Sequence, residues 1–594
     1  MDARPTPRLP PVHTLSISRS STVSTLCASP ERLTRAPIDM QADSPLDKVA
    51  SPDPRVDGVE LPEDKAVQEA APDVIWVEWD GDDDPENPFN WTRRRKWIIS
   101  GVGIMFCALV SLSVSAYSIA AANIQQDLDT SRLLTISGIT FFTLTFGAAP
   151  LLLAPLSEVY GRSYIYLVSS VVFTLFFIPQ AVARNIETML VSRFIQGIAG
   201  STAVSLVGGT LTDVWIGRER GPKMAWFSWA AFGSTGLGPV IFGYMAQNLG
   251  FRYISWVMFA MSAVFSISLF WILDETRASV LLSRRAARLR KETGDKRYTS
   301  RDDFERGSLR EMMRTSLARP VRMLYREPVL IAFTCWISFT WGVLYLCLVS
   351  IPIVFERIYR FNTGEAGLLY ITQTIGSTLG LIVDYYCDKL YQKNVAKRGP
   401  EARLYTAFVG GILVPLGSYL YAFTSYPQVP WIAPAIGIVV LYTGMYCVYL
   451  STFSYLAESY SLYASSALSG MSFVRNIVGA VFPLFTTALY DRLGVQGAGG
   501  LTAGIATLLS ATPFVLYRYG ASLRSRSPFA RELARLEAEK NAKQAREVAT
   551  TTAPVAPPAT NDEARDPEKG RRRTVSRGDE AQDDVEEKDQ VVIV

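Results

Sequence analysis

Two residues of opposite charge, Glu158 and Arg162, interrupt a part of the chain that otherwise avoids charge. They lie in the segment APLSEVYGRSY, which separates two long apolar runs, and Gly161 stands beside the arginine. A carboxylate and a guanidinium one helical turn apart can pair with each other or with groups across an interface, and glycine permits a tight reversal of the chain. The spacing predicts an ion-pair gate; ordinary loop charges are the alternative interpretation.

Arg193 and Gln196 form a second polar site, because apolar residues surround them in the segment RFIQGIAGS. An arginine at membrane depth costs about 3 kcal/mol or more. We therefore expect Arg193 to face a cavity or a partner, and bracing of neighbouring helices is the structural alternative.

The only histidine is His13, near the start of the chain, so proton transfer would have to use carboxylates. Most of the carboxylates available lie near the ends of apolar runs, which suits gating better than proton binding at mid-membrane. The candidates are Glu158, Asp213, Asp384, Asp388 and Glu458.

Glycines crowd the segment WAAFGSTGLGPVIFGYM. Pro239 removes a backbone hydrogen bond from its helix, and glycines let neighbouring helices approach closely, so we expect a bend and tight packing here. The glycines concerned are Gly233, Gly236, Gly238 and Gly243.

A further group of residues could line a cavity for an apolar or amphipathic small molecule. It combines aromatic side chains with two polar points on other apolar runs. The aromatic residues can equally well pack against their neighbours, and both interpretations stay open. The group consists of Trp336, Trp341, Tyr345, Gln373 and Asn123.

The elements that carry these residues are apolar runs of membrane-spanning length. Hydrophobic residues make up 49% of the 594 residues and charged residues only 19%, which favours a membrane protein. A hydrocarbon core needs roughly 20 apolar residues in a helix. The sequence thus predicts an all-α integral membrane protein with twelve transmembrane helices, since twelve buried helices of a soluble protein would leave too little polar surface. They start near Trp97, Leu133, Tyr164, Glu187, Lys223, Arg252, Val329, Ala366, Leu404, Val429, Ala467 and Leu501.

Basic residues set the predicted orientation, because cytosolic connections are rich in Lys and Arg. They gather before the first span, after the fourth and eighth, and above all in the connection 275–328 after the sixth. Both termini are therefore expected in the cytosol. The long connection divides the spans six and six, and its composition fits amphipathic helices on the inner leaflet or a solvated linker.

Five parts of the chain follow from this pattern. The polar composition of the two ends is typical of disorder, although the acidic segment DGDDDPENPFNW before the first span carries aromatics and can dock on the cytosolic face. The parts are a disordered cytosolic tail (1–92), a six-helix half (93–274), a cytosolic central loop (275–328), a second six-helix half (329–522) and a largely disordered cytosolic tail (523–594).

The absence of certain sequence motifs disfavours several classes of function. Five of the six cysteines fall inside apolar runs, which fits neither a disulfide framework nor a zinc site. The sequence has no Gly-x4-Gly-Lys-Ser/Thr pattern, which argues against an ATP-driven pump. We expect no enzyme activity, no metal, no cofactor and no nucleic-acid partner.

Six plus six helices around a long loop resemble the major facilitator superfamily. The segment APLSEVYGR is similar to that family's loop motif between spans two and three; it keeps Leu156, Glu158, Gly161 and Arg162, with Ala154 in place of the first glycine and Ser163 in place of a second basic residue. The resemblance implies that Arg162 reaches Asp213 at the inner end of span four and that this cluster closes the cytosolic side.

Two further motifs refine the resemblance. The Arg-x-x-Gln-Gly order at Arg193 matches the family motif that is tied to proton coupling, and the Gly-Pro segment around Pro239 resembles the motif of drug and proton antiporters, with Phe242-Gly243 where Gly-Gly is common. From about Asn87 to Ala530 the sequence resembles the fungal branch of the drug and proton antiporters. These likenesses favour export over uptake.

The resemblance implies a proton-coupled exporter of a drug-like compound or a self-made secondary metabolite. Its partners would be a small-molecule cargo, protons and the lipid bilayer, and we expect a monomer in the plasma membrane. Export of an organic acid or a polyamine, proton-coupled import and solute sensing are the alternatives. A polyamine is disfavoured because Leu348, Val349 and Ser350 stand where similar polyamine exporters tend to carry a glutamate.

Overall fold

A computed structural model describes residues 74–81, 83–305 and 309–527, together with positions 529, 531, 532, 535, 536 and 538. Most of the two tails that we expect to be disordered lies outside these residues. The described residues all belong to one compact unit, Asp73–Val594.

The first half of the helical bundle contains six long helical segments, two of them continuous and four broken into two elements. Each break is a single residue, as at Ala149 before Pro150, where α5 begins. The elements are α2 (Arg93–Ile119), α3 (Ala121–Asp127), α4 (Arg132–Ala148), α5 (Pro150–Tyr160), α6 (Arg162–Leu175), α7 (Phe177–Ala181), α8 (Ile186–Gly200), α9 (Thr202–Val214), α10 (Gly217–Leu249) and α11 (Phe251–Ile272).

The second half repeats this plan after the central loop. Its elements are α15 (Pro328–Tyr359), α16 (Thr363–Leu368), α17 (Ile371–Arg398), η2 (Gly399–Arg403), α18 (Leu404–Thr424), α19 (Ile432–Tyr460), η3 (Ser461–Tyr463), α20 (Ala464–Leu509) and α21 (Thr512–Arg526).

The described helices account for the twelve predicted spans. Nine helical stretches are long and apolar enough to cross a membrane, and the pair α4 and α5, bent by 46°, makes a tenth. The stretch Ala464–Gly520 has 57 residues, roughly 85 Å as one helix, and it breaks at Gly494 (φ 70°), so it supplies two crossings. We take α10 as the remaining span, because its 33 residues are long enough to cross a membrane, although it is less apolar than the nine stretches above.

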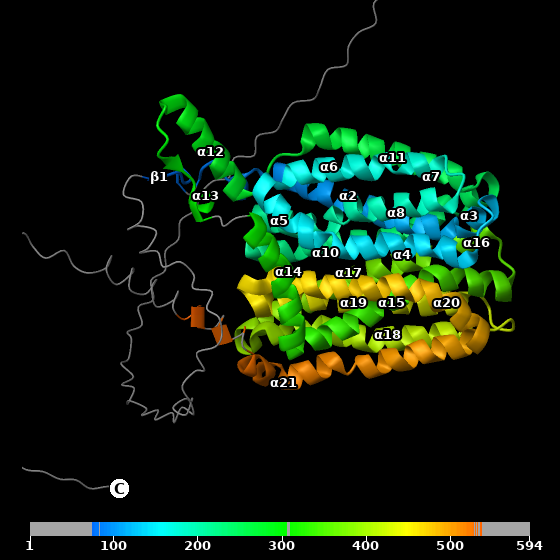
Figure 1. Ribbon diagram of the computed structural model, residues 1–594. Coiled ribbons are helices and arrows are strands. Elements are labelled where there is room, and N and C mark those ends of the chain that lie inside the picture. The colour runs from blue at the N-terminus through cyan, green and yellow to red at the C-terminus, as the bar shows by residue number, and fades with distance from the viewer. Residues whose placement is uncertain are drawn as a thin grey trace, which may run out of the picture. The chain divides into compact units, whose positions relative to one another are not determined.

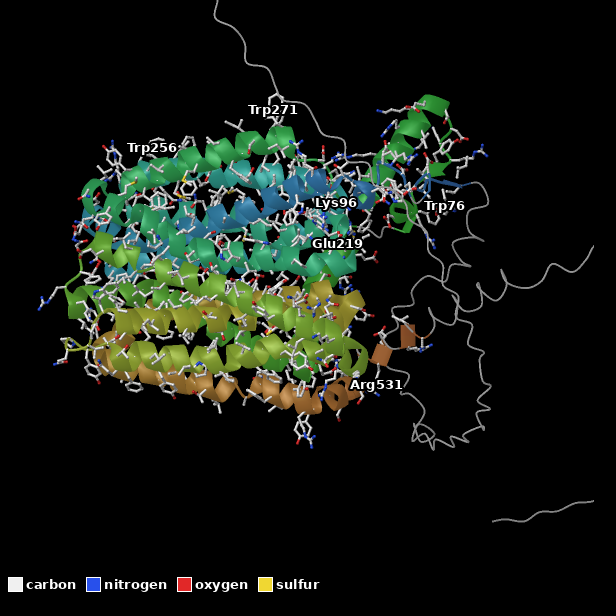
Figure 2. All side chains as sticks on the ribbon, turned by 180° about the vertical axis from the view of Figure 1, so that it is seen from behind. Trp76, Lys96, Glu219, Trp256, Trp271 and Arg531 are labelled. Carbon is white, nitrogen blue, oxygen red and sulfur yellow. The ribbon has the colours of Figure 1, made fainter. Side chains whose placement is uncertain are left out.

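The outer surface of the bundle is apolar, as a membrane protein requires. Figure 2 shows Trp256 and Trp271 projecting outward from α11. Trp271 is 81% exposed and Phe270 70% exposed, which in water would be strongly unfavourable. Lipid is the solvent that such a surface fits.

The two halves meet along a seam formed by α10 against α16 and α17 and by α4 against α20 (Figure 1). Side chains hydrogen-bond to backbone carbonyls across it. The Tyr446 hydroxyl donates to the Ala225 carbonyl at 2.9 Å, and the Ser118 hydroxyl donates to the Leu348 carbonyl at 2.8 Å. These bonds satisfy polar groups that lipid could not.

The central loop folds into α12 (Ala278–Thr293), β2 (Tyr298–Thr299), α13 (Arg301–Glu305) and α14 (Leu309–Arg326). Residues 74–92, here called the strap, dock on it at one end of the bundle (Figure 1). In the strap, β1 (Ile75–Trp76) pairs in parallel with β2, and η1 (Pro88–Asn90) leads into α2.

Arginines of α12 neutralise the acidic side chains of the strap. Arg285 donates to Asp84 at 2.7 Å and also pairs with Asp80. The strap is thus ordered, in contrast to the disorder that we expect for most of 1–92; docking of its acidic segment is the alternative that the sequence leaves open. The second tail also begins later than expected, because Ser527 is buried and donates to Glu327 at 2.6 Å.

Candidate functional site

Arg162 begins α6 and holds together the end of the bundle that carries the central loop. Its side chain is buried, and its Nε donates to the Asp213 carboxylate at 2.5 Å. The backbone N–H of Arg162 donates to Glu275 at 3.0 Å, and the Ser163 hydroxyl donates to the same carboxylate at 2.8 Å. The predicted pairing of Arg162 with Asp213 is present in this structure.

Two glycines make room for this cluster. Gly161 adopts φ +98°, which side chains rarely tolerate, and a Cβ there would meet the Glu275 carboxylate. A Cβ at Gly209 would meet the Arg162 guanidinium. The glycine of the motif therefore lets a carboxylate cap the first turn of α6, where free backbone N–H groups favour negative charge.

Glu158 lies at the edge of the cluster and is not paired with Arg162. It faces Arg277, whose guanidinium lies 4.0 Å from Glu158 and 3.7 Å from Asp213. We name these five residues the gate cluster. Its members are Glu158, Arg162, Asp213, Glu275 and Arg277.

Sequence reasoning missed Glu275 and Arg277, which come directly after α11. The segment DETR, an acid and a base placed at the end of an apolar run, is the signal that could have indicated them. All members of the gate cluster come from the first half and the start of the loop, so the cluster braces that half internally.

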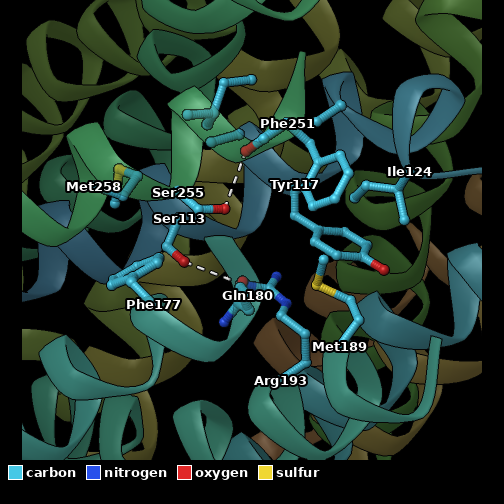
Figure 3. Close-up of a pocket in the computed structure, with 13 residues that line it drawn as sticks. Ser113, Tyr117, Ile124, Phe177, Gln180, Met189, Arg193, Phe251, Ser255 and Met258 are labelled. Atoms are coloured by element: carbon cyan, nitrogen blue, oxygen red, sulfur yellow. Dashed lines mark hydrogen bonds between the residues drawn. The ribbon is translucent and has the colours of Figure 1, made fainter. Parts of the chain in front are cut away.

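Arg193 of α8 is buried inside the first half, with 1% of its surface exposed. Its Nη1 donates to the Ser113 hydroxyl at 3.2 Å and lies 3.4 Å from the Gln196 side-chain oxygen. The guanidinium carbon lies 4.4 Å from the centre of the Tyr117 ring, a cation–π distance. Figure 3 shows Arg193 beside Ser113, Tyr117 and Gln180 in a pocket of the first half.

Gln196 forms hydrogen bonds to neighbouring residues beside this pocket. Its side-chain oxygen accepts from Gln180 at 2.6 Å, and its side-chain nitrogen donates to the Phe173 carbonyl at 3.2 Å. Arg193 keeps two nitrogens, Nε and Nη2, without a hydrogen-bond partner, and we find no acidic partner for it within the described ranges. A buried guanidinium in this state favours an incoming anion, a water or a rearrangement.

A cavity lies between the halves. Residues of α2, α4, α9 and α10 line one side of it, and residues of α15, α19 and α20 line the other. Ser111 and Thr235 supply polar groups, and most of the remaining wall is apolar or aromatic. This composition is typical of a small-molecule site.

Two of the five predicted cavity residues, Trp341 and Tyr345, line this cavity. Trp336 is buried against Phe333, with ring centres 6.3 Å apart. Gln373 is fully buried, and its side-chain atoms have no hydrogen-bond partner. Asn123 is half-buried in α3. Neither of these polar residues, nor Trp336, lines the cavity.

Arg475 of α20 is a cavity residue that sequence reasoning missed. Its guanidinium carbon lies 4.2 Å from the centre of the Trp341 ring and 5.2 Å from that of Tyr449. A lone arginine in the segment FVRNIVGA, between apolar residues, was the available signal.

The glycines of α10 lie where that helix approaches its neighbours most closely. A Cβ at Gly236 would lie 2.6 Å from the Tyr370 carbonyl oxygen, and one at Gly243 would lie 3.1 Å from the Cα of Gly367. Gly238 faces α2 instead, at Ser115. The Gly233 carbonyl accepts from Thr374 at 2.8 Å. The helix continues without interruption through Pro239.

A second charged cluster occupies the second half at the same end as the gate cluster. Arg403 donates to Asp388 at 2.9 Å and to Glu458 at 2.6 Å, and Asp384 lies 3.5 Å from the Thr406 hydroxyl. The carboxylates that we considered for proton transfer thus lie near this end of the helices. No group of three His, Cys, Asp or Glu residues that could hold a metal occurs among the described residues.

Comparison with known proteins identifies the family. Residues 102–483 match the sequence profile of the Major Facilitator Superfamily. The chain belongs to the major facilitator superfamily. The match spans both halves and confirms the resemblance drawn from the motifs.

Similar members of the superfamily are fungal transporters. The MFS transporter paaT of Penicillium rubens is 35% identical over 75% of this chain and 82% of its own. The citrinin biosynthesis cluster MFS transporter mrr1 of Monascus ruber is 34% identical over 77% of this chain and 93% of its own. The multidrug transporter mdrA of Aspergillus fumigatus is 32% identical over 77% of this chain and 76% of its own.

Solved structures confirm the major facilitator fold. The proton:xylose symporter XylE has a TM-score of 0.54 at 14% identity, over 72% of this chain and 96% of the symporter. At this identity the likeness concerns the fold alone. The chain is an all-α, multi-pass membrane transporter of small molecules and not an enzyme.

Proposed function

We propose that this protein exports small organic molecules in exchange for protons, with a drug-like compound or a self-made secondary metabolite as cargo. The observation that carries the proposal is the largely apolar cavity between the halves, which the glycine-proline helix α10 helps to line. Relatives described as a multidrug transporter and as a transporter of the citrinin biosynthesis cluster support the choice of cargo.

The seam supplies a mechanism for moving the cargo. Glycines at positions 236 and 243 let α10 pack closely against α16 and α17. Because this contact lacks bulky side chains, the two halves can tilt relative to each other while each half stays rigid. The cavity then opens to one side of the membrane at a time. The gate cluster holds α5, α6, α9 and the loop together, so that the first half moves as one body.

The orientation is part of the same proposal. The end of the bundle with the gate cluster, the strap and the central loop carries the basic connections, and the positive-inside rule puts it in the cytosol. A plasma-membrane location and a monomeric state complete the proposal.

Proton coupling is assigned to Arg193 and Gln196. Arg193 lacks an acidic partner in its pocket within the described ranges, so its interactions must change when charge enters or leaves the neighbouring space. The proton itself would bind to a carboxylate at the cytosolic end, where Asp213, Asp384 and Glu458 lie. Polyamine export finds no support, because no carboxylate of the described residues lines the central cavity.

The proposal is tested by expressing the full chain in a fungal strain that lacks its own efflux pumps. Cells would be loaded with antifungal drugs and fungal metabolites of different charge. We expect lower accumulation of some of these compounds than in cells with the Arg162→Ala variant, and we expect a protonophore to remove the difference. Equal accumulation of every compound, or faster entry, would argue for a sensor or an importer.

A further inference from the structure

Among the residues that the structure describes, Arg475 is the one charged side chain that lines the central cavity. It is 1% exposed, and its Nε and Nη1 have no hydrogen-bond partner within that part of the chain. Its contacts are aromatic, with Trp341 at 4.2 Å, Tyr449 at 5.2 Å and Phe453 at 5.4 Å from the guanidinium carbon. Ring faces attract the cation, but they supply no counter-charge, and among these three side chains only the Tyr449 hydroxyl is an acceptor for the guanidinium.

The surroundings of Arg475 add another donor. Trp341 also lines the cavity, and its indole N–H is buried without an acceptor. In the part of the chain that the structure describes, no acid pairs with Arg475. The cavity wall therefore offers unused N–H donors and a net positive charge.

We propose that the central cavity recognises aromatic organic anions, with the anionic group on Arg475 and the aromatic ring beside Trp341 and Tyr449. This assignment rests on the proposed export function and names the class of its cargo. Carboxylates, ionised phenols and sulfonates share the necessary chemistry, because a guanidinium binds their oxygens with charge-assisted hydrogen bonds.

The charge of the cargo determines how well it binds at this site. An anion neutralises Arg475 and satisfies its unused donors, which removes the cost of a lone charge in a low dielectric. A cation of the same shape meets repulsion, and a neutral molecule leaves the charge unpaired. Stacked rings, such as Trp341 and Tyr449 at 5.7 Å between centres, supply affinity that all three classes share.

Binding to the purified full chain in lipid nanodiscs tests the assignment. The probes are naphthalene-2-sulfonate, 2-naphthylmethanol and 2-naphthylmethyl-trimethylammonium, which share one ring system and differ in charge. Calorimetry at neutral pH should show the tightest binding for the sulfonate. We expect Arg475→Gln to weaken sulfonate binding by roughly tenfold or more and to change binding of the alcohol little.

Further variants separate recognition from folding. Arg475→Lys keeps the charge and should keep the preference for the sulfonate, with weaker binding because the planar fork is lost. Trp341→Phe keeps a ring and removes the indole N–H, so it should weaken all three probes less than Arg475→Gln weakens the sulfonate. Arg492→Gln, an exposed position on the same helix, serves as the matched control. Thermal unfolding of each variant shows that the fold is intact.

Each outcome decides the assignment. Equal binding of the three probes by the wild type, failure to bind the sulfonate, or a preference that survives Arg475→Gln would overturn it, even if the protein exports neutral drugs. Conversely, a protein that binds the sulfonate through Arg475 but moves no compound outward would overturn the export proposal and leave anion recognition standing.

Discussion

At the scale of single residues, the Arg162 guanidinium and backbone are held by two carboxylates that lie far apart in the chain, Asp213 and Glu275. Replacing Arg162 by alanine removes the guanidinium from the Asp213 carboxylate, which keeps only Arg277 at 3.7 Å, while the backbone N–H bond to Glu275 remains. Losing one partner of this buried pair costs about 3 kcal/mol. We expect the variant to reach the membrane but to lose export.

The measurement is efflux from loaded cells together with surface abundance of the protein. Arg290→Ala, an exposed arginine of α12, is the control and should export normally. Normal export by Arg162→Ala would show that the gate cluster is not needed for the transport cycle.

Arg193 gives a second prediction at this scale. Arg193→Ala should lose uphill export while some downhill flux remains, because coupling and not the pathway depends on the charge. Arg193→Lys should also be impaired, since lysine lacks the rigid planar group that holds Nη1 between Ser113 and Gln196. Arg184 is exposed, and the Arg184→Ala variant serves as the control. Accumulation of cargo against its gradient by the alanine variant would make Arg193 a packing residue.

At the scale of elements, the strap joins the region before α2 to α12. The pKa of Asp84 lies below that of an ordinary aspartate, chiefly because the backbone N–H of Asp80 donates to its carboxylate. Arg285 lowers this pKa further, and burial opposes both effects. Because the pKa is lower in the docked strap than in a free one, docking is favoured at neutral pH and weakens as the pH falls through the docked-state pKa.

At neutral pH, Asp84→Asn should weaken docking of the strap, as low pH does in the wild type. We expect faster amide hydrogen exchange at Ile75 and Val77, whose N–H groups donate to Arg297 and Thr299. The exposed Asp83 is the control, and Asp83→Asn should exchange like the wild type. Unchanged exchange in Asp84→Asn would mean that strand pairing alone holds the strap.

The packing of α10 gives a prediction with a control on the same helix. Gly236→Ala places a Cβ against the Tyr370 carbonyl and the Thr374 backbone, and should destabilise the protein by roughly 1–3 kcal/mol. A Cβ at Gly221 meets nothing within 4 Å, so Gly221→Ala should be neutral or stabilising through helix propensity. Thermal unfolding in detergent compares the two, and equal melting temperatures would contradict the proposed seam.

The sequence predicts elements better than contacts. Span starts such as Leu133 and Arg252 fall within one residue of a helix start, because the apolar length that a bilayer demands is a local property of the chain. The family motif predicts the pairing of Arg162 with Asp213. Glu275 was not, since its bonds to Arg162 and Ser163 bridge more than a hundred residues.

The strap shows a different reason for a failed prediction. Its acidic composition is typical of disorder when it is considered alone, and only the arginines of α12, brought close by the fold, reverse that expectation. Arg475 was overlooked because one charge inside an apolar run does not reveal that it faces a cavity. In each of these cases the missing information was a distant neighbour.

At the scale of the whole molecule, the proposed topology puts the strap, the central loop and the gate cluster in the cytosol. Protease added to sealed, right-side-out cells should leave the loop 275–328 intact, and permeabilised cells should show cleavage there. A site engineered between α3 and α4, at Asp129, should be cut from outside and serves as the control. Cleavage of the loop in sealed cells would reverse the orientation.

If a proton gradient drives export through the cavity, reconstituted vesicles should show it without other transporters present. Purified protein in proteoliposomes would be given an imposed pH difference and permanently charged naphthalene probes of either sign, plus a neutral antifungal azole. We predict accumulation of at least one compound above its equilibrium level, proton movement in the opposite direction, and loss of both with a protonophore or with Arg193→Ala. Equilibration of every compound without regard to the pH difference would contradict the account.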